Sequence, residues 1–495
     1  MLEIIAMVSG MLVMILEMTG ARVMAPHLGT SIIVWTSLIG VVLACLALGA
    51  WLGGRLADRE ASTRQLALIL AWAGGGMGLT ALLHEPVAAW VTTSVFNPYL
   101  AAVLCASLLF GLPATSFGMV TPYVIRLAMT DVSTSGQVVG RLYALSTLGS
   151  IVGTFLGGFV LISWFGSTHI LLAGSTVMLL LSVLVCMRPV RGRACLLVLV
   201  ALAAWLSESW TRFQEKNGGV ISVETPYNHI RIARTMNMHG RELLYLSTDP
   251  GRFQSAMYVD DPVELALSYT RLYALGPLLA PRAQRVLMLG GGGYSVPKWL
   301  LAGRSGLKTD KMRVDVVEID PGMTRVAKEY FQLPEDERLR VFHEDVRVFC
   351  NRNTEQYDLV FVDVFGSSYT VPFHAGTVEA AAAMRRAVAD DGILLMNVIA
   401  SAEGEAANLL WSIRNGLAEH FAEVHVLAVQ EPDNASVIQN FMLLALPHPR
   451  PGVLAADELA SYRERLMPSG PDVAPLRDEF APVERYALPL ALSDY

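Results

Sequence analysis

A glycine-rich turn and a series of acidic residues follow successive apolar segments in the second half of the chain. Gly290 to Gly293 follow RVLML, Glu318 and Asp320 end VDVVEID, Asp345 ends RVFHED, and Asp363 lies near the end of YDLVFVDVF. A glycine turn lets the backbone approach a nucleotide at the N-terminus of the next helix, and a carboxylate after the second strand can accept ribose hydroxyls. The set predicts a site for an adenosine-containing ligand.

Each acidic residue also has a structural alternative. We expect Asp345 to accept the adenine amine and Asp363 to lie beside the reacting carbon, because both follow strands that end at the same edge of a sheet. Glu318, Asp320 and Asp345 could instead cap the helices that follow them. The segment DVFGSSYTVPFH, residues 363–374, could be an ordinary connector.

The elements that carry these residues alternate between apolar strands and helical patterns. This alternation predicts a doubly wound, mostly parallel sheet in a Rossmann-like α/β domain. Its strands are RVLML, VDVVEID, RVFHED, YDLVFVDVF, GILLMNVI, VHVLAVQ and NFMLLAL, the last of which we expect to run antiparallel. A helix is expected over residues 262–280. Alternating polar and apolar residues over 219–260 predict a small antiparallel sheet before it.

The first half of the chain is nearly all apolar. The whole sequence is 53% hydrophobic and 16% charged, which indicates membrane spans. Blocks long enough to cross a bilayer lie at residues 4–24, 31–53, 66–84, 98–120, 141–164 and 168–187. The block at 194–206 is shorter and suits an interfacial or seventh helix.

Arginines cluster in alternate loops of this half, at residues 55–64, 126–141 and 188–193. By the positive-inside rule these loops and the N-terminus are cytoplasmic. An even number of spans then returns the chain to the cytoplasm, so we expect a multi-pass inner-membrane protein with a cytoplasmic catalytic domain. Gly149, Gly153 and Gly157 allow close helix approach, either within the chain or across a homodimer.

Composition argues against several other partners. A net charge of −7 gives no support to a nucleic-acid partner. The five cysteines have no CxxC spacing, so we expect neither disulfides nor a metal site. The expected partners are a small-molecule substrate and the lipid bilayer.

The second half resembles the spermidine synthase family of polyamine aminopropyltransferases over about residues 220–450. Ser268-Tyr269-Thr270, the four glycines, EID, HED and VDVF occur in the family's order. The resemblance implies a class I methyltransferase-like fold that binds S-adenosylmethionine or decarboxylated S-adenosylmethionine as substrate, with a polyamine as candidate acceptor. It implies that Glu318 holds the ribose and Asp345 the adenine, with Gln254 and Tyr269 lining the alkyl-donor pocket.

The whole chain is similar to proteins that fuse such a domain to several membrane spans. We therefore expect a membrane domain over 1–207, a small sheet over 219–262, a catalytic domain over 263–450 and a tail over 451–495.

The chain departs from the family at two acidic positions. Gly293, followed by Tyr294, stands where the family carries an aspartate that binds the donor's amine. Gly366 stands where the family carries the aspartate that deprotonates the acceptor. A protonated amine has no lone pair, so it must lose a proton before it can attack. The remaining candidates for this task are Asp363, Tyr369 and His374, with Tyr227, His229 and Tyr294 at the pocket rim.

Three function classes remain open. The first is an enzyme that releases 5′-methylthioadenosine from a sulfonium, by aminopropyl transfer to an amine or by attack of the donor's own amine. The second is a methyltransferase of a membrane-proximal substrate, whose product would be S-adenosylhomocysteine. The third is a transporter or sensor whose soluble half binds ligand without chemistry.

Overall fold

The computed structural model describes residues 1–495 except 30, 60, 96, 186–218, 249–252, 366–371 and 494–495. The chain divides into two compact units, Met1–Gly219 and Val220–Tyr495. The predicted interfacial helix at 194–206 and the candidate residue Tyr369 lie outside the described residues.

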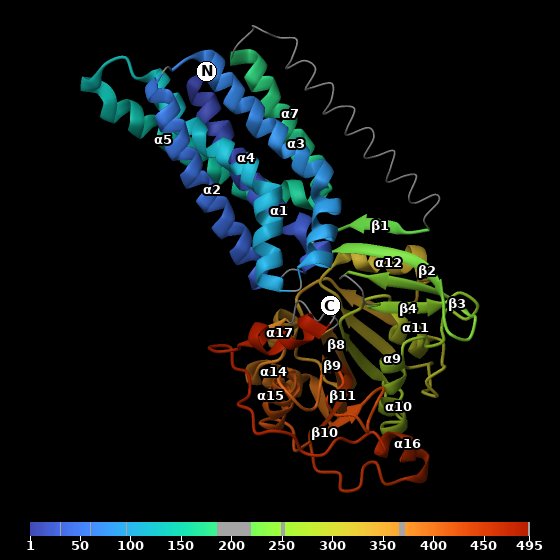
Figure 1. The fold of residues 1–495 in the computed structure, drawn as a ribbon. Helices are drawn as coiled ribbons and strands as arrows, with labels where there is room; N and C mark the ends of the chain where they lie inside the picture. Colours follow the sequence, from blue (N-terminus) through green and yellow to red (C-terminus); the bar gives the residue numbers. More distant parts are fainter. Residues whose placement is uncertain are drawn as a thin grey trace. The chain divides into compact units, whose positions relative to one another are not determined.

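The first unit is a bundle of long helices (Figure 1). Its helices are α1 (Leu2–Leu28), α2 (Ile32–Arg59), α3 (Thr63–Ser94), α4 (Pro98–Ala128), α5 (Ser135–Phe155) and α7 (Ser167–Val185), with η1 (Val132–Thr134) before α5 and η2 (Leu156–Leu161) and α6 (Ile162–Trp164) extending it. Within the described residues, six helical stretches are long and apolar enough to cross a membrane. Each overlaps one of the six predicted spans, and most are longer than predicted.

Glycines bring neighbouring helices of this unit into close contact. A Cβ atom on Gly149 would lie 1.9 Å from the Met7 carbonyl oxygen, and one on Gly153 would lie 2.2 Å from that of Met11. Both contacts join α5 to α1, so this stripe packs within the chain and is not available as a dimer seam. A Cβ atom on Gly49 of α2 would likewise lie 2.0 Å from the Thr115 carbonyl oxygen of α4. Small residues at helix interfaces permit such backbone approach.

The second unit begins with the predicted antiparallel sheet. In the described residues its strands follow chain order: β1 (Ile221–Glu224), β2 (His229–Met236), β3 (Glu242–Ser247) and β4 (Ser255–Tyr258). Ile230, Ile232 and Leu246 of this sheet are fully buried in one cluster with Val326 and Phe331. The small sheet is therefore fixed to the helix that follows the second parallel strand.

The larger sheet confirms the expected Rossmann-like fold. Its strands are β5 (Arg285–Leu289), β6 (Arg313–Val317), β7 (Leu339–Phe342), β8 (Tyr357–Phe365), β9 (Val388–Ala400), β10 (Glu423–Ala428) and β11 (Gln439–Leu446). In the part of the chain that is described, their order is β10-β11-β9-β8-β5-β6-β7. Strand β11 runs antiparallel to both neighbours, as predicted. This mixed order is that of class I methyltransferase-like folds.

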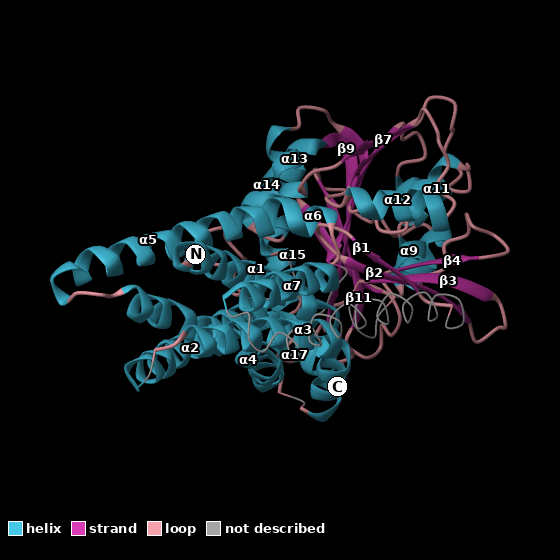
Figure 2. Ribbon diagram, turned by 90° about the horizontal axis from the view of Figure 1, so that it is seen from above, coloured by secondary structure: helices cyan, strands magenta, loops and turns pink. Residues whose placement is uncertain are grey.

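Helices cover both faces of this sheet (Figure 2). One face carries α9 (Ser268–Leu272), α11 (Ser295–Leu301) and α12 (Pro321–Tyr330), and the other α13 (Val346–Arg352), α14 (Val378–Ala387) and α15 (Ala407–Ala418). Helix α10 (Leu275–Leu279) shares a core with α9 and α11, and η3 (Phe373–Ala375) shares one with α13 and α14. The helix predicted over 262–280 is instead two short helices, α9 and α10. Pro277 has no N–H group to donate to the Tyr273 carbonyl, so Gly276 makes that bond and the helix breaks there.

The segment after residue 450 packs onto the same body. It forms η4 (Asp457–Leu459), α16 (Ala460–Arg463) and α17 (Val483–Ser493). Leu476, Val483 and Leu490 are at most 1% exposed and join the core beneath α14 and α15.

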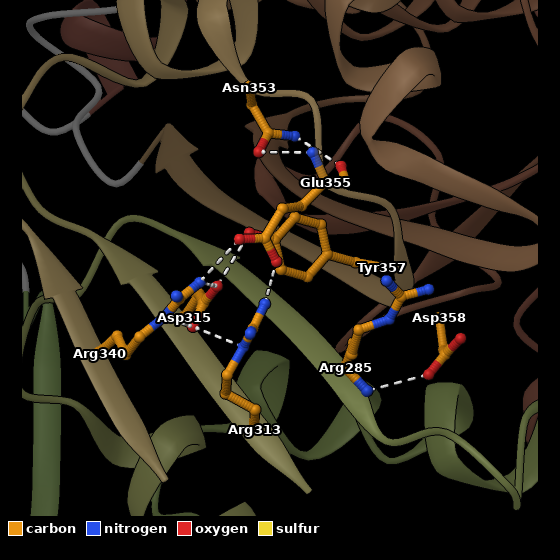
Figure 3. Close-up of polar contacts among 8 residues, drawn as sticks. All are labelled: Arg285, Arg313, Asp315, Arg340, Asn353, Glu355, Tyr357 and Asp358. Carbon is orange, nitrogen blue, oxygen red and sulfur yellow. Dashed lines mark hydrogen bonds and ion pairs between the residues drawn. The ribbon is translucent and has the colours of Figure 1, made fainter. Parts of the chain in front are cut away.

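An ion network ties the parallel strands together below their carboxyl ends (Figure 3). Asp315 of β6 is fully buried and accepts from Arg340 Nε of β7 at 2.9 Å and from the Tyr357 hydroxyl of β8 at 2.9 Å. Arg313 and Arg340 also pair with Glu355. A buried carboxylate is tolerated because these donors satisfy it.

Candidate active site

The glycine turn after β5 has little room for any side chain. Gly290 has φ +95°, and a Cβ atom there would lie 2.3 Å from the Asp363 carbonyl oxygen. Gly292 also has positive φ, at +50°. Only glycine adopts the φ of Gly290 without strain. Because Gly290 has no Cβ atom, the ends of β5 and β8 can come into contact there.

Glu318 lies under this turn, 8% exposed. Its Oε2 accepts the N–H groups of Gly291 at 2.8 Å and Gly292 at 3.2 Å, and its Oε1 accepts that of Asp320 at 2.9 Å. Burial raises the pKa of Glu318, and these backbone hydrogen bonds oppose the rise. The carboxylate is thereby fixed at the end of β6, where one oxygen keeps a lone pair that could accept a further hydrogen bond.

The last position of the turn is closed by the small sheet. The Gly293 N–H group donates to Ser255 Oγ at 2.9 Å. A Cβ atom on Gly293 would lie 2.9 Å from Ser255 Cβ and 3.3 Å from the Phe331 ring. The family's aspartate therefore does not fit here without rearrangement.

Tyr294 is fully buried rather than at a pocket rim. It has φ +55°, and its hydroxyl lies 2.7 Å from Thr324 Oγ1. Burial raises the pKa of Tyr294 well above its ordinary value. Its ring packs closely against Gly291, since a Cβ atom on that glycine would lie 2.8 Å from the ring.

Asp320 has the features of a structural cap. It is fully buried and accepts the Gly322 N–H group at 2.8 Å at the start of α12. Its other oxygen accepts the Thr225 hydroxyl at 2.5 Å and the Asn228 amide at 2.9 Å. These bonds attach the small sheet to the Rossmann-like body, so both oxygens are already engaged.

Asp345 combines a cap with a side-chain contact. Its Oδ1 accepts the N–H groups of Arg347 and Val348 at the start of α13, and its Oδ2 lies 2.9 Å from His374 Nε2. His374 lies on η3, so the structure joins two candidates that are far apart in sequence. Its side chain and that of Asp345 remain partly exposed, at 37% and 28%.

Asp363, near the end of β8, is hydrogen-bonded through both of its carboxylate oxygens. Its Oδ2 accepts the Tyr269 hydroxyl at 3.0 Å, and its Oδ1 accepts the Asn397 amide at 3.0 Å. Burial raises the pKa of Asp363, while these two hydrogen bonds lower it. Burial and the nearby Asp363 charge raise the pKa of Tyr269 well above its ordinary value.

Gln254 contacts this group through its backbone. Its carbonyl oxygen lies 3.2 Å from the Tyr269 hydroxyl, and its side chain accepts the Thr248 hydroxyl at 2.9 Å. Tyr227 is 51% exposed and His229 Nε2 lies 2.5 Å from Ser222 Oγ, both on the small sheet. Within the described residues, the hydrogen bonds of the Asp363 carboxylate come from Tyr269 and Asn397 instead.

Three polar residues that the sequence analysis did not single out complete the site: Ser255, Asn397 and Asn440. Asn397 is a lone polar residue in the apolar strand GILLMNVIA, a signal that could have identified it. Ser255 and Asn440 carry no such signal, because each directly follows another polar residue, Gln254 and Gln439, near the start of its strand. Among the described residues, no group of three or more histidine, cysteine or acidic side chains could hold a metal ion.

The chain is similar to known proteins in this region. Residues 268–445 match a family model described as the spermine/spermidine synthase domain. A polyamine aminopropyltransferase from Vibrio vulnificus is 29% identical over 156 residues, covering 31% of this chain and 50% of the relative. One from Corynebacterium efficiens is 22% identical over 376 residues, covering 67% of this chain and 70% of the relative. The chain thus spans about half the length of the first of these relatives.

A solved structure also matches. The crystal structure of a probable spermidine synthase from Corynebacterium glutamicum gives a TM-score of 0.41 at 22% identity, covering 55% of this chain and 93% of the other. By the family model, residues 268–445 are similar to the spermine/spermidine synthase domain, and the first unit of the chain is a bundle of long apolar helices.

Proposed function

We propose that the second unit is a transferase that cleaves an adenosyl sulfonium, either S-adenosylmethionine or its decarboxylated form, and releases 5′-methylthioadenosine. The observation that carries this proposal is the position of Asp363. Its carboxylate lies at the strand end that contacts the glycine turn, with one oxygen bonded to Tyr269 and the other to Asn397. The spermine/spermidine synthase domain match supports the same chemistry.

In this proposal the ligand's nucleoside part is held by two carboxylates. Glu318 accepts the ribose hydroxyls, and Asp345 accepts the adenine amine, for which His374 competes at Oδ2. The sulfonium then lies near Asp363 and Tyr269. An aromatic ring near the sulfonium stabilises its positive charge by about 0.5–2 kcal/mol.

The reaction needs an amine with a free lone pair. Asp363 takes a proton from the substrate's ammonium group, and the lone pair left on nitrogen attacks the carbon next to sulfur. The carbon–sulfur bond breaks, and its electron pair stays on sulfur as the neutral thioether of methylthioadenosine. The protein mainly holds the nitrogen in line with the breaking bond.

The attacking amine belongs to a second substrate of the polyamine class or to the donor itself. The tight packing of Gly293 against Ser255 supports a site without the family's amine-binding aspartate at this position. We propose that the six apolar helices anchor this enzyme in the inner membrane, with the second unit cytoplasmic.

Product analysis of the detergent-solubilised protein tests the proposal. The protein is incubated with each sulfonium, with and without putrescine, and the nucleoside products are separated. Methylthioadenosine is the expected product, and its formation without putrescine would indicate internal cyclisation. S-adenosylhomocysteine would indicate a methyltransferase instead. Absence of both nucleosides would contradict any transfer chemistry on these donors.

A further inference from the structure

A chain of side-chain amides ends on the Asp363 carboxylate. Gln430 Nε2 donates to Asn440 Oδ1 at 3.4 Å, Asn440 Nδ2 to Asn397 Oδ1 at 3.0 Å, and Asn397 Nδ2 to Asp363 Oδ1 at 3.0 Å. Asn397 is 1% exposed and lies on β9, which pairs with both β8 and β11. Because an ionised carboxylate only accepts, Asn397 must present its N–H group, and Asn440 must donate to the oxygen that remains.

The other carboxylate oxygen has a different neighbour. Asp363 Oδ2 lies 3.0 Å from the Tyr269 hydroxyl oxygen, which also lies 3.2 Å from the Gln254 carbonyl oxygen. A hydroxyl group has one hydrogen, so it serves one of these acceptors well at a time. When Tyr269 donates to Gln254, its own oxygen can accept a hydrogen bond from a protonated Oδ2.

The two oxygens of Asp363 are therefore not equivalent. A proton on Oδ1 would face the N–H group of Asn397, and the bond from Asn440 opposes a rotation of that amide. A proton on Oδ2 is accommodated by the Tyr269 hydroxyl. The other titratable group that the described structure places near Asp363 is Tyr273, whose hydroxyl already donates to the Val362 carbonyl at 2.8 Å.

We propose that Asn397, oriented by Asn440, is a positioning residue that keeps Oδ1 an acceptor and directs the substrate proton to Oδ2. This role rests on the proposed function. In the step, an N–H bond of the substrate's ammonium group breaks, its electron pair stays on nitrogen, and an O–H bond forms at Oδ2. Asp363 becomes neutral, and Tyr269 turns its O–H bond to the Gln254 carbonyl. No proton passes through the amides.

The test is an infrared pH titration of the full-length protein in detergent. The carboxyl band of Asp363 is assigned by its absence from Asp363→Asn. Asn397→Leu keeps the shape of the side chain but removes the donor. We expect its Asp363 midpoint to rise by about one pH unit, about tenfold in the protonation constant, since a hydrogen bond to a charged group contributes at least that much.

Asn440, the second amide in the series that ends on Asp363, gives an independent variant. Asn440→Ala should shift the midpoint in the same direction by less, and the double variant should match Asn397→Leu alone, because the two residues act in series. Asn415→Ala is the matched control. That amide donates to the Val473 carbonyl at 2.8 Å, away from Asp363, and should leave the midpoint unchanged.

An unchanged midpoint in Asn397→Leu, or shifts that add in the double variant, would overturn the proposal. If Asn397→Leu does not fold, an unchanged midpoint in Asn440→Ala overturns it alone. The acid limb of methylthioadenosine release should move with the infrared midpoint. If the wild-type protein releases no methylthioadenosine, the proposed function fails, while the infrared midpoints still show whether Asn397 keeps Oδ1 of Asp363 an acceptor.

Discussion

At the scale of single residues, Asp363 sets the expected pH dependence of activity. Burial raises its pKa from the ordinary value of 3.8. A general base acts when ionised, so the rate of methylthioadenosine release should fall as the pH drops through this raised pKa. Asp363→Asn should lower the rate by about 10²–10⁴-fold and remove this acid limb. Initial rates across the acidic range check this, and a limb that persists in the variant would belong to another group.

Gly293 is one of the two positions where the resemblance to the aminopropyltransferases predicts an aspartate and this chain has a glycine. Gly293→Asp should destabilise the second unit by about 1–3 kcal/mol, because the new Cβ atom would lie 2.9 Å from Ser255 Cβ. Ser255→Gly should relieve part of this cost, whereas Ser255→Ala should not. Denaturant titration measures the effect. Gly416→Ala is the control, since its Cβ atom would meet no atom closer than 3.7 Å.

At the scale of elements, the network around Asp315 holds β6, β7 and β8 in register. Asp315→Ala would leave Arg340 without its main partner and the Tyr357 hydroxyl without its acceptor. We expect a loss of about 2–4 kcal/mol in the free energy of unfolding, below the value for a fully buried pair because Arg340 is partly exposed. Unfolding of the second unit followed by circular dichroism checks this. A loss no larger than that of an exposed pair such as Arg234–Glu242 would contradict it.

A buried lysine of α11 contacts the C-terminal end of helix α12. Lys298 is 3% exposed and donates to the Phe331 carbonyl at 2.5 Å, and burial lowers its pKa to about 8. The unfolded chain binds this proton up to its ordinary pKa of 10.5, so the free energy of unfolding should rise with pH from about 8 to 10.5.

The rise attributable to Lys298 should be on the order of 3 kcal/mol, at 1.36 kcal/mol per pH unit. Lys298→Met should remove it. The measurement is the difference in unfolding free energy between wild type and variant across this range. A difference that stays constant with pH would show that the lysine keeps an ordinary pKa.

At the scale of the whole molecule, the second unit depends on its last segment. Leu490 is fully buried in the core beneath α15. Leu490→Ala should cost about 2–5 kcal/mol, because it leaves a cavity in that core. Phe480→Ala in the same segment should cost little, since Phe480 is 72% exposed. Thermal unfolding of both variants checks this, and equal midpoints would contradict it.

The sequence alone determined the features that depend on neighbouring residues. Hydropathy separates the two units, and glycines mark the turn after β5. Apolar residues that recur every second position indicate strands, and those that recur every third or fourth position indicate helices. These signals are local, so they need no knowledge of the fold. The missing N–H group of Pro277 is local as well, yet the break between α9 and α10 was not predicted.

Only the tertiary structure decided how the candidate residues are used. Asp320 and Glu318 are two residues apart, yet Asp320 is engaged by Thr225 and Asn228, which come from the small sheet. Tyr269 and Asn397 meet at Asp363 across separations of 94 and 34 residues. The order of strands brings them together, and strand order is set by packing over the whole domain rather than by any local pattern.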